Sequence, residues 1–345
     1  MPSIPPSFSL SASPSSAVAN DAEPALTPAA ASEMAAPAKA PQWELARVVD
    51  ELRQARAIWR ERQQRAREVG SREFPSNDAL RDIVNALCGA LFPMRLGPPE
   101  LHKESEDYYV GHTLDSAMHA LLTQVRLELR YVARQSATDS ARIEERAVQV
   151  VREFAAALPR LRVVLDNDVL AAFQGDPAAR SVDEVLLCYP GVRAIIHYRL
   201  AHELYRLDVP MLARMVSELA HSETGIDIHP GAQIAGGFFI DHGTGVVIGE
   251  TAIIGEGVRL YQAVTLGAKR FPADEQGHLR KGLPRHPIVE DNVVIYAGAT
   301  ILGRITIGRG STIGGNVWLT HSVPPGSNVT QADTLQHCSP DDLSG

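Results

Sequence analysis

The stretch GIDIHPGAQIAGGFFIDHGTGVVIGE, residues 225–250, decides the fold because isoleucine recurs in it at a fixed interval. The isoleucines that set this interval are Ile228, Ile234, Ile240, Ile248 and Ile254. All neighbouring pairs but one are six residues apart. Between Ile240 and Ile248 the interval is longer by two residues, and the slip falls on the segment DHGTG.

The six-residue period continues beyond this stretch, with one long interruption. Aliphatic residues hold every further anchor position: Leu260, Leu266, Val289, Ile295, Ile301, Ile307, Ile313 and Leu319. A hexapeptide period predicts a parallel β-helix, in which each hexad forms one short face and three hexads complete a coil. The anchors are then expected to point inward and to stack from coil to coil.

The residues before the repeat follow a different hydrophobic pattern. From Trp43 onward, apolar residues recur at helical spacing opposite a charged face. Helical segments are predicted over residues 43–69, 77–92, 113–135, 139–158, 163–173, 182–189, 191–207 and 209–223. Pro159, Pro190 and Pro210 are expected to lie at helix boundaries. The fold class is therefore α+β, with an N-terminal all-α domain followed by a C-terminal β-helix.

Four regions follow from these patterns. Residues 1–42 are rich in Ala, Pro and Ser, and we expect them to be disordered because they cannot bury enough apolar surface. Residues 43–223 form the helical domain, which can cover the first coil of the β-helix. Residues 224–325 form the β-helix, with a loop at 267–287, and residues 326–345 form a C-terminal tail.

Composition excludes several classes of protein. The chain has 345 residues, 45% hydrophobic and 21% charged, and a formal net charge of −8. The negative net charge and the absence of a basic cluster in the sequence argue against a nucleic-acid partner. No apolar run is long enough to span a membrane, and the composition of the first residues does not predict a secretion signal. Three scattered cysteines, Cys88, Cys188 and Cys338, predict a reducing, cytoplasmic location.

Both interruptions of the period are candidate functional loops. A stacked coil accommodates extra residues only by extruding them, and loops on a rigid scaffold often carry binding and catalytic groups. The two-residue slip contains His242, whose imidazole suits general-base catalysis. Asp227 precedes it by 15 residues, about one coil, and could orient that imidazole. The long insertion ends in Arg285 and His286, and an arginine can bind a carboxylate with two hydrogen bonds.

Each of these residues also has a purely structural interpretation. His242 alone could be a surface histidine, and Asp227 could simply follow the end of a helix. Arg285 could be a solvated loop residue, and His286 a loop histidine before a proline. The remaining histidines of this region, such as His229, are interpreted as structural or surface residues.

Five segments of the repeat resemble serine O-acetyltransferase, the hexapeptide-repeat enzyme that opens cysteine biosynthesis. They are DIHPGAQI, FFIDHGTGVVIGETA, VTLGA, RHPIVEDNVVIYAGATILG and IGGNVWLTHSVPPGS. The resemblance covers about residues 160–326 and is to the variant with a longer loop before the Arg-His pair. It implies a left-handed parallel β-helix that forms a homotrimer or a dimer of trimers, with active sites between adjacent subunits.

The resemblance also implies a reaction, the transfer of acetyl from acetyl-CoA to the hydroxyl of L-serine. In that reaction His242 is the base that takes the hydroxyl proton, and Asp227 orients His242. Asp241, together with Asp176 in QGDPAARS, holds the amino group of serine. L-cysteine is implied as a feedback inhibitor that binds where serine binds.

The other ends of the two substrates are assigned in the same way. Arg285 and His286 hold the serine carboxylate. Acetyl-CoA is expected along the coil edge near Gly267, Ala268, Ala297 and Gly298, where a main-chain N–H could stabilise the oxyanion. The resemblance implies acetyl-CoA as a co-substrate and no metal or redox cofactor.

The C-terminal sequence departs from the family pattern. Many of these enzymes end in an isoleucine that inserts into O-acetylserine sulfhydrylase. This chain ends in HCSPDDLSG. A sulfhydrylase complex formed by that route is therefore not expected.

Three alternatives stay open. A γ-class carbonic anhydrase has the same kind of β-helix, but it presents two zinc-binding histidines five residues apart, and the histidines of the repeat do not have this spacing. A hexapeptide acetyltransferase for homoserine or a sugar differs from the favoured enzyme only in the acceptor. A non-catalytic β-helix scaffold would keep the fold without the activity.

Overall fold

The computed structural model describes residues 44–62, 74–133, 140–270, 274, 278–280 and 282–332. The chain divides by its contacts into two compact units, residues 1–70 and residues 71–345. Helix α1 (Leu45–Arg62) belongs to the first unit, and the second contains all the other described helices and strands. The expected disorder of residues 1–42 concerns residues outside those described, as does most of the predicted C-terminal tail. The predicted domain limits stay predictions.

The second unit opens with a helical part. Its helices are α2 (Asn77–Leu91), α3 (Pro93–Leu96), α4 (Glu106–Ala133), α5 (Ser140–Gly175), α6 (Val182–Cys188), α7 (Pro190–Arg206) and α8 (Pro210–Thr224), with a short 3-10 helix η1 (Lys103–Ser105) before α4. Their buried apolar side chains join those of the β-helix in one continuous hydrophobic core. Among the described helices, none is both long enough and apolar enough to cross a membrane.

The prediction of a helix boundary at Pro159 is wrong, because α5 runs through this residue without a break. Leu158 and Leu161, on either side of it, are both buried in the core. Continuous packing of this face keeps the helix intact even though proline removes one backbone hydrogen bond. Pro190 and Pro210 behave as expected, since each begins a helix.

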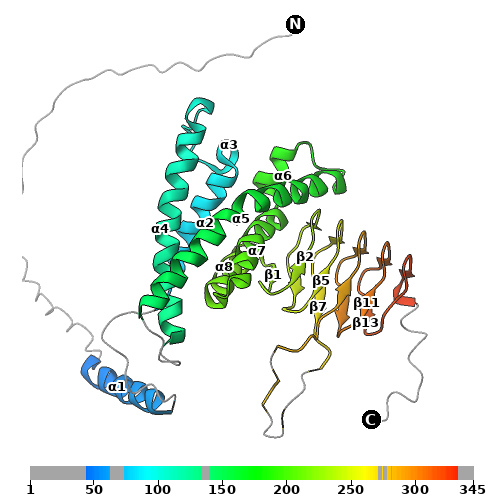
Figure 1. Cartoon of the computed structure of the whole chain (residues 1–345). Coiled ribbons are helices and arrows are strands. Elements are labelled where there is room, and N and C mark those ends of the chain that lie inside the picture. The colour runs from blue at the N-terminus through cyan, green and yellow to red at the C-terminus, as the bar shows by residue number, and fades with distance from the viewer. Residues whose placement is uncertain are drawn as a thin grey trace, which may run out of the picture. The chain divides into compact units, whose positions relative to one another are not determined.

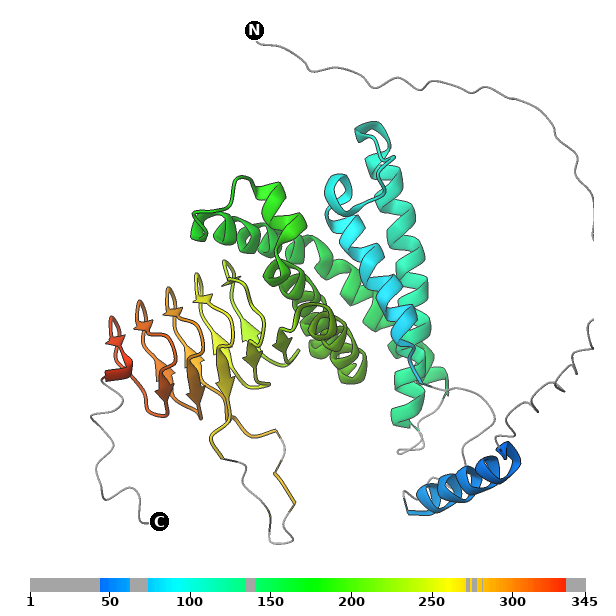
Figure 2. The ribbon, with the colours of Figure 1, turned by 180° about the vertical axis from the view of Figure 1, so that it is seen from behind.

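From residue 227 the chain winds into a left-handed parallel β-helix (Figures 1 and 2). Its strands are β1 (Asp227–Ile228), β2 (Gln233–Ile234), β3 (Phe239–Ile240), β4 (Val247–Ile248), β5 (Ile253–Ile254), β6 (Arg259–Leu260), β7 (Thr265–Gly267), β8 (Ile288–Val289), β9 (Val294–Ile295), β10 (Thr300–Leu302), β11 (Thr306–Ile307), β12 (Thr312–Ile313), β13 (Trp318–Leu319) and β14 (Asn328–Val329). They form a first sheet β1-β4-β7-β10-β13, a second sheet β11-β8-β5-β2 and a third sheet β14-β12-β9-β6-β3.

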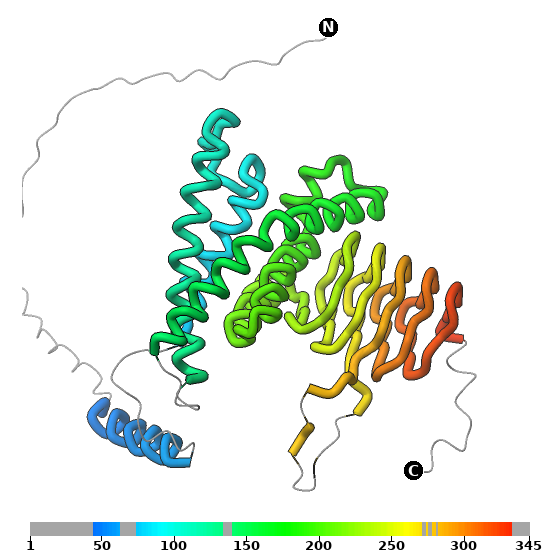
Figure 3. Tube along the Cα trace, viewed as in Figure 1, coloured from blue at the N-terminus to red at the C-terminus, as the bar shows by residue number. Residues whose placement is uncertain are grey.

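The aliphatic anchors of the repeat form the interior of this β-helix. In the first sheet the register joins Ile228 to Ile248, Leu266, Ile301 and Leu319 in turn. All five are buried, and the other two sheets pair their anchors in the same way. The predicted architecture, a helical region followed by a β-helix of hexapeptide repeats, is therefore confirmed. Figure 3 shows that the successive coils stack directly on one another.

The same register identifies the two residues that interrupt the repeat. Hydrogen bonds between the first two coils align Asp241 with Tyr261, and the residue after Gly243 with Gln262. His242 and Gly243 therefore have no counterpart in the next coil. Both have positive φ, 60° and 91°, so the extra pair leaves the wall as a tight bulge and the coil then resumes its register.

A buried ion pair joins the helices to the first coil. Arg199 on α7 donates to both carboxylate oxygens of Asp168 on α5, at 2.9 and 3.0 Å. Arg199 also donates to the carbonyl oxygens of Ile234 and Ala235 at 2.6 and 2.7 Å. Asp168 in turn accepts the N–H of Phe238 at 2.9 Å. The pair thus forms hydrogen bonds with backbone groups at the end of the solenoid, where a further coil would otherwise pair with them.

Replacing Arg199 with methionine should destabilise the protein strongly. Arg199 and Asp168 are only 7% and 1% exposed, so the substitution leaves a carboxylate buried without its counter-charge. The expected loss is about 3–5 kcal/mol in the free energy of unfolding, measured by urea denaturation. Arg81→Met is the control, because the ion pair between Arg81 and Asp78 is exposed and such pairs contribute about 0–1 kcal/mol. Equal effects from the two substitutions would contradict this account of the joint.

Candidate active site

The bulge between β3 and β4 presents His242 to solvent. The side chain is 73% exposed, although the strands on both sides are buried at their anchors. Gly243 is tightly enclosed, since a Cβ at this position would collide with Cδ1 of Ile226 and φ is positive. The glycine thus lets the backbone pack closely against the core while the imidazole points away from the wall.

Two carboxylates lie beside His242. The nearer carboxylate oxygen of Asp241 is 3.9 Å from Nε2 of the imidazole. Asp176, directly after α5, accepts a hydrogen bond of 2.5 Å from the hydroxyl of Tyr189. This hydrogen bond, then one from a backbone N–H and the positive charges of Arg259 and His242, lower the pKa of Asp176. The structure therefore brings Asp176, Asp241 and His242 into one group, although they come from two distant parts of the sequence.

Arg259 completes this group, although it was not predicted from the sequence. Its Nη2 donates to Asp241 Oδ2 at 2.8 Å. The guanidinium also lies over the rings of Phe239 and Tyr261, at 5.0 and 4.7 Å from their centroids. The signal was present in the register, because Arg259 pairs with Phe239 one coil below, close to the bulge. In sequence alone an arginine before an anchor resembles any outward-facing residue of a hexad.

Asp227 lies on β1 in a different set of contacts. Its carboxylate is 3.7 Å from Nη1 of Arg214. Ligand-type atoms of Asp227, Glu218 and His221 lie within 4.8 Å of one another, and the arginine already supplies the positive charge there. Among the described residues, Asp227 and His242 share no hydrogen bond in this single chain. The expected pairing of these two side chains stays a prediction.

Arg285 and His286 form a second group at the end of the long loop. Arg285 donates to Glu250 at 2.7 Å. The backbone N–H groups of Arg285 and His286 both donate to the hydroxyl of Thr251, at 2.9 and 3.1 Å. The N–H of Thr251 donates to Nδ1 of His286 at 3.0 Å, which assigns the proton of the neutral ring to Nε2. Glu250 and Thr251, which hold the pair in place, were not predicted from the sequence.

The charges in this second group are set by burial and by Arg285. Burial, followed by the positive charge of Arg285, lowers the pKa of His286 to about 4, so the ring is neutral at pH 7. For Glu250, burial acts to raise the pKa, but the hydrogen bond from Arg285 and the nearby positive charges outweigh it and the pKa is lowered. Arg285 and Glu250 are therefore a charged pair beside a neutral histidine.

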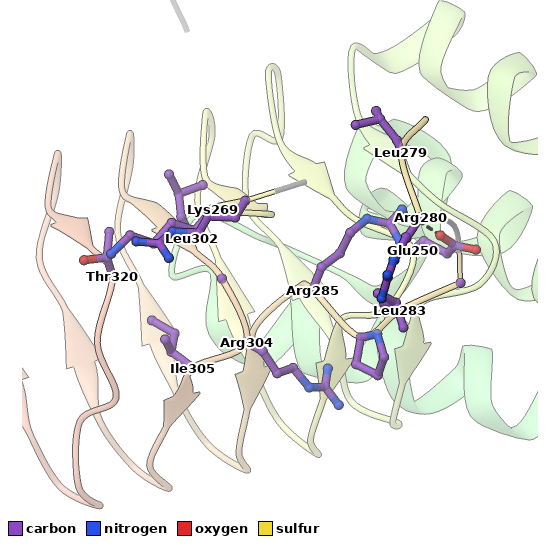
Figure 4. Close-up of a pocket in the computed structure, with 14 residues that line it drawn as sticks. Glu250, Lys269, Leu279, Arg280, Leu283, Arg285, Leu302, Arg304, Ile305 and Thr320 are labelled. Carbon is purple, nitrogen blue, oxygen red and sulfur yellow. Dashed lines mark hydrogen bonds and ion pairs between the residues drawn. The ribbon is translucent and has the colours of Figure 1, made fainter. Parts of the chain in front are cut away.

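A cavity of about 660 Å³ lies between the long loop and the wall of the β-helix (Figure 4). Its lining is strongly basic. The cationic residues are Lys269, Arg270, Arg280, Arg285 and Arg304, and Glu250 is the one acidic residue among the described lining. Arg304 is also anchored to the wall, since it donates to the carbonyl oxygens of Thr251 and His286 at 2.6 and 3.0 Å. This shape and charge fit an anionic, extended ligand.

The residues predicted to bind acetyl-CoA lie at two ends of the first sheet. Gly267 ends β7 and Ala268 follows it, next to Lys269 of the cavity. Ala297 and Gly298 precede β10, at the other end of these strands. A single chain therefore does not bring the four together.

The two groups of polar residues are separated in the same way. His242 lies where the chain passes from the third sheet to the first. Arg285 lies beside the turn from the first sheet to the second. In Figures 1 and 2 the long loop leaves one edge of the β-helix, and the connection between α5 and α6 lies over the opposite edge. The predicted site residues thus form two separate half-sites in one chain.

Comparison with known proteins agrees with this fold. Residues 286–321 match the family model "Bacterial transferase hexapeptide (six repeats)". The "Serine acetyltransferase, plasmid" of Synechococcus elongatus is 58% identical over 262 residues, which cover 75% of this chain and 82% of the relative. This chain belongs to the serine acetyltransferase family. It is therefore an acyltransferase of the hexapeptide-repeat type.

Other relatives and solved structures support the serine acetyltransferase assignment. The serine acetyltransferase of Bacillus licheniformis is 48% identical over 166 residues, which cover 48% of this chain and 73% of the relative. Serine acetyltransferase 1 of Entamoeba histolytica, solved in complex with L-cysteine, matches with a TM-score of 0.62 and 38% identity, over 72% of this chain and 86% of that one. Its native structure matches with a TM-score of 0.62 and 37% identity, over 76% and 90%.

Replacing Gly249 with alanine should lower the acetyltransferase activity, because it displaces the imidazole of His286. An added Cβ would collide with Cδ2 and Nε2 of the imidazole, so the ring has to move. If His286 binds serine as predicted, kcat/KM for serine should fall by about tenfold or more, because a displaced binding group costs transition-state contacts. Gly236→Ala is the matched control, since a Cβ there meets no heavy atom within 4 Å. Unchanged kinetics in Gly249→Ala would exclude a role for the position of His286.

Proposed function

We propose that this chain transfers the acetyl group of acetyl-CoA to the hydroxyl of L-serine, giving O-acetyl-L-serine and CoA, with His242 as the general base. The product is the first intermediate of cysteine biosynthesis. One observation carries the proposal. The hexapeptide repeat of this chain, a member of the serine acetyltransferase family, is interrupted by two residues. These two residues place an exposed imidazole beside two carboxylates.

The chemistry of the reaction accounts for such an imidazole. The serine hydroxyl has a high pKa, so it attacks a thioester only as a base removes its proton. In the proposed step, His242 takes this proton while the serine oxygen bonds to the carbonyl carbon. The tetrahedral intermediate then breaks the carbon–sulfur bond, and His242 returns the proton to the departing CoA thiolate. A main-chain N–H near Gly267 and Ala268, or near Ala297 and Gly298, stabilises the oxyanion in between.

Asp227 is proposed as the residue that orients His242. In the single chain its carboxylate faces Arg214, so this role requires the carboxylate to accept a hydrogen bond from the imidazole instead. A carboxylate in that position fixes the tautomer and stabilises the imidazolium that forms during the reaction.

Serine is proposed to bind between two copies of the chain. Its ammonium group fits the carboxylates of Asp176 and Asp241. Asp241 also neutralises Arg259. Its carboxylate fits Arg285 together with the neutral His286. Because these groups lie at different corners of the β-helix, a neighbouring copy has to supply the second half-site. A homotrimer, alone or as a dimer of trimers, provides this arrangement.

Acetyl-CoA is proposed to place its phosphates in the basic cavity and its thioester at the sheet edge. Lys269, Arg270 and Arg280 supply positive charge for a pyrophosphate and a further phosphate. The apolar lining residues Leu279 and Leu302 suit the uncharged arm of the molecule. The proposed chemistry uses acetyl-CoA as a co-substrate and needs no metal or redox cofactor, because a thioester is already activated.

L-cysteine is proposed to inhibit the enzyme by occupying the serine site. The Entamoeba histolytica relative with a TM-score of 0.62 was solved in complex with L-cysteine. Cysteine carries the same ammonium and carboxylate groups as serine, so the same carboxylates and the same arginine can bind it. Inhibition competitive with serine follows from a shared site.

The direct test is CoA thiol release by the purified protein, with L-serine, L-homoserine and a galactoside compared as acceptors. We expect turnover with L-serine, and a fall of about 10²–10⁴-fold in kcat/KM for His242→Ala because the general base is lost. His119→Ala, at an exposed histidine on α4, is the control. Turnover with another acceptor alone would reject serine as the substrate, and full activity in His242→Ala would reject the proposed base.

A further inference from the structure

Tyr189 lies at the junction of α6 and α7, with its ring against the hydrophobic core and its hydroxyl on Asp176. The ring is partly buried and packs against the core of the second unit. The hydroxyl donates to Oδ2 of Asp176 at 2.5 Å. This hydrogen bond, followed by burial, raises the pKa of Tyr189 to about 12. The hydroxyl therefore keeps its proton at pH 7 and acts as a donor.

Two glycines fix the backbone on both sides of this hydrogen bond. A Cβ on Gly191 would lie 2.2 Å from a carbonyl oxygen of β3, and a Cβ on Gly175 would lie 2.9 Å from an aromatic ring of the same strand. Glycine is needed where the start of α7 and the end of α5 approach β3 this closely. Asp176 directly follows Gly175, and Tyr189 precedes Gly191 by two residues. Both partners of the hydrogen bond are thus held against the strand that leads into Asp241.

The two carboxylates of this group differ in how their charge is compensated. Asp241 is paired with the guanidinium of Arg259 at 2.8 Å. Asp176 accepts from two neutral donors, the hydroxyl of Tyr189 and the N–H of Ala178 at 2.8 Å, and no ion pair joins it to a cation of the described chain. Two carboxylates and one guanidinium leave one net negative charge, which is complementary to a single ammonium group.

We propose that Tyr189 is a positioning residue that holds Asp176 for the ammonium group of an amino-acid acceptor. The inference rests on the proposed function, which places that ammonium group at Asp176 and Asp241. A carboxylate oxygen accepts two hydrogen bonds, so the oxygen that Tyr189 holds can still accept one from the ligand. A carboxylate that is already oriented loses less conformational freedom when the ligand binds, and the affinity is higher for that reason.

This role makes Tyr189 a determinant of acceptor class. A sugar has no ammonium group and would leave the oriented carboxylate of Asp176 without its charged partner. Sites built around a buried or fixed polar group reject ligands that lack the matching group. Tyr189 therefore favours amino acids over sugars as acceptors.

Steady-state kinetics of Tyr189→Phe in the full chain tests the proposal, because this substitution removes the hydroxyl and keeps the ring. We expect KM for L-serine to rise about tenfold, since a hydrogen bond to a charged group is lost. The kcat should change much less, because Tyr189 touches no reacting atom. The inhibition constant of 3-hydroxypropanoate, which is serine without its ammonium group, should stay unchanged. Tyr108→Phe, at an 83% exposed tyrosine on α4, is the matched control and should alter none of these constants.

A double-mutant cycle determines whether Tyr189 acts through Asp176. In an Asp176→Ala chain, adding Tyr189→Phe should not lower kcat/KM for L-serine any further, because the carboxylate that the hydroxyl orients is already gone. An equal loss from Tyr189→Phe in both backgrounds would overturn the proposal.

The kinetic outcomes separate this inference from the proposed function. If L-serine is turned over and its KM is unchanged in Tyr189→Phe, Tyr189 does not position Asp176. Equal weakening of L-serine and 3-hydroxypropanoate would show a general structural role and would also overturn the proposal. Absence of turnover of L-serine by the wild-type chain would reject the proposed function, and this inference with it.

Discussion

The structure depends on a constraint of register, since every strand of the β-helix has to align with the strands one coil before and after it. The interior is a set of stacked aliphatic columns, and each anchor sits on an anchor of the neighbouring coil. A residue added within a face would rotate every later side chain and expose the column to water. Extra residues are therefore tolerated only where they leave the wall at a corner.

Both departures from the period obey this constraint and both carry polar groups. The first adds His242 and Gly243, where only a glycine fits against Ile226. The second is the long loop that ends in Arg285 and His286 before β8. In each case the neighbouring coils are rigid, so the backbone position from which the extruded side chain projects is fixed. The half-sites are precise because the scaffold that holds them cannot shift in register.

The constraint also accounts for the separation of the half-sites. One corner of the β-helix bears His242, near a carboxylate from the end of α5. Another corner bears Arg285, fixed by Glu250 and Thr251. Neither set can migrate along the solenoid, and in the proposed function a substrate with opposite charges at its two ends is therefore held by corners of two different copies. The buried pair of Arg199 and Asp168 holds the helical part, and with it Asp176, against the first coil.

Sequence was sufficient for those features that register controls. The period predicted the anchor positions from Ile228 to Leu319 and the place of the slip, because each aliphatic column tolerates little variation. It did not predict β14, where Val329 pairs with Ile313. It failed where packing overrides local preference, as at Pro159, which lies inside α5. It also missed Arg259 and Tyr189, whose partners Asp241 and Asp176 are distant in sequence. Such pairs are determined by tertiary contacts, so no local sequence pattern predicts them.

The central claim is that one active site needs two copies of the chain, and complementation tests it most directly. His242→Ala and Arg285→Ala chains are co-expressed with different tags, and the assemblies that contain both are isolated. Each variant alone should be nearly inactive. Random mixing in a cyclic trimer regenerates an intact site at one of the three interfaces of each mixed assembly, so the isolated mixed assemblies should have about a third of the wild-type activity. Mixed assemblies as inactive as the separate variants would show that both half-sites must belong to one chain, and would contradict the account.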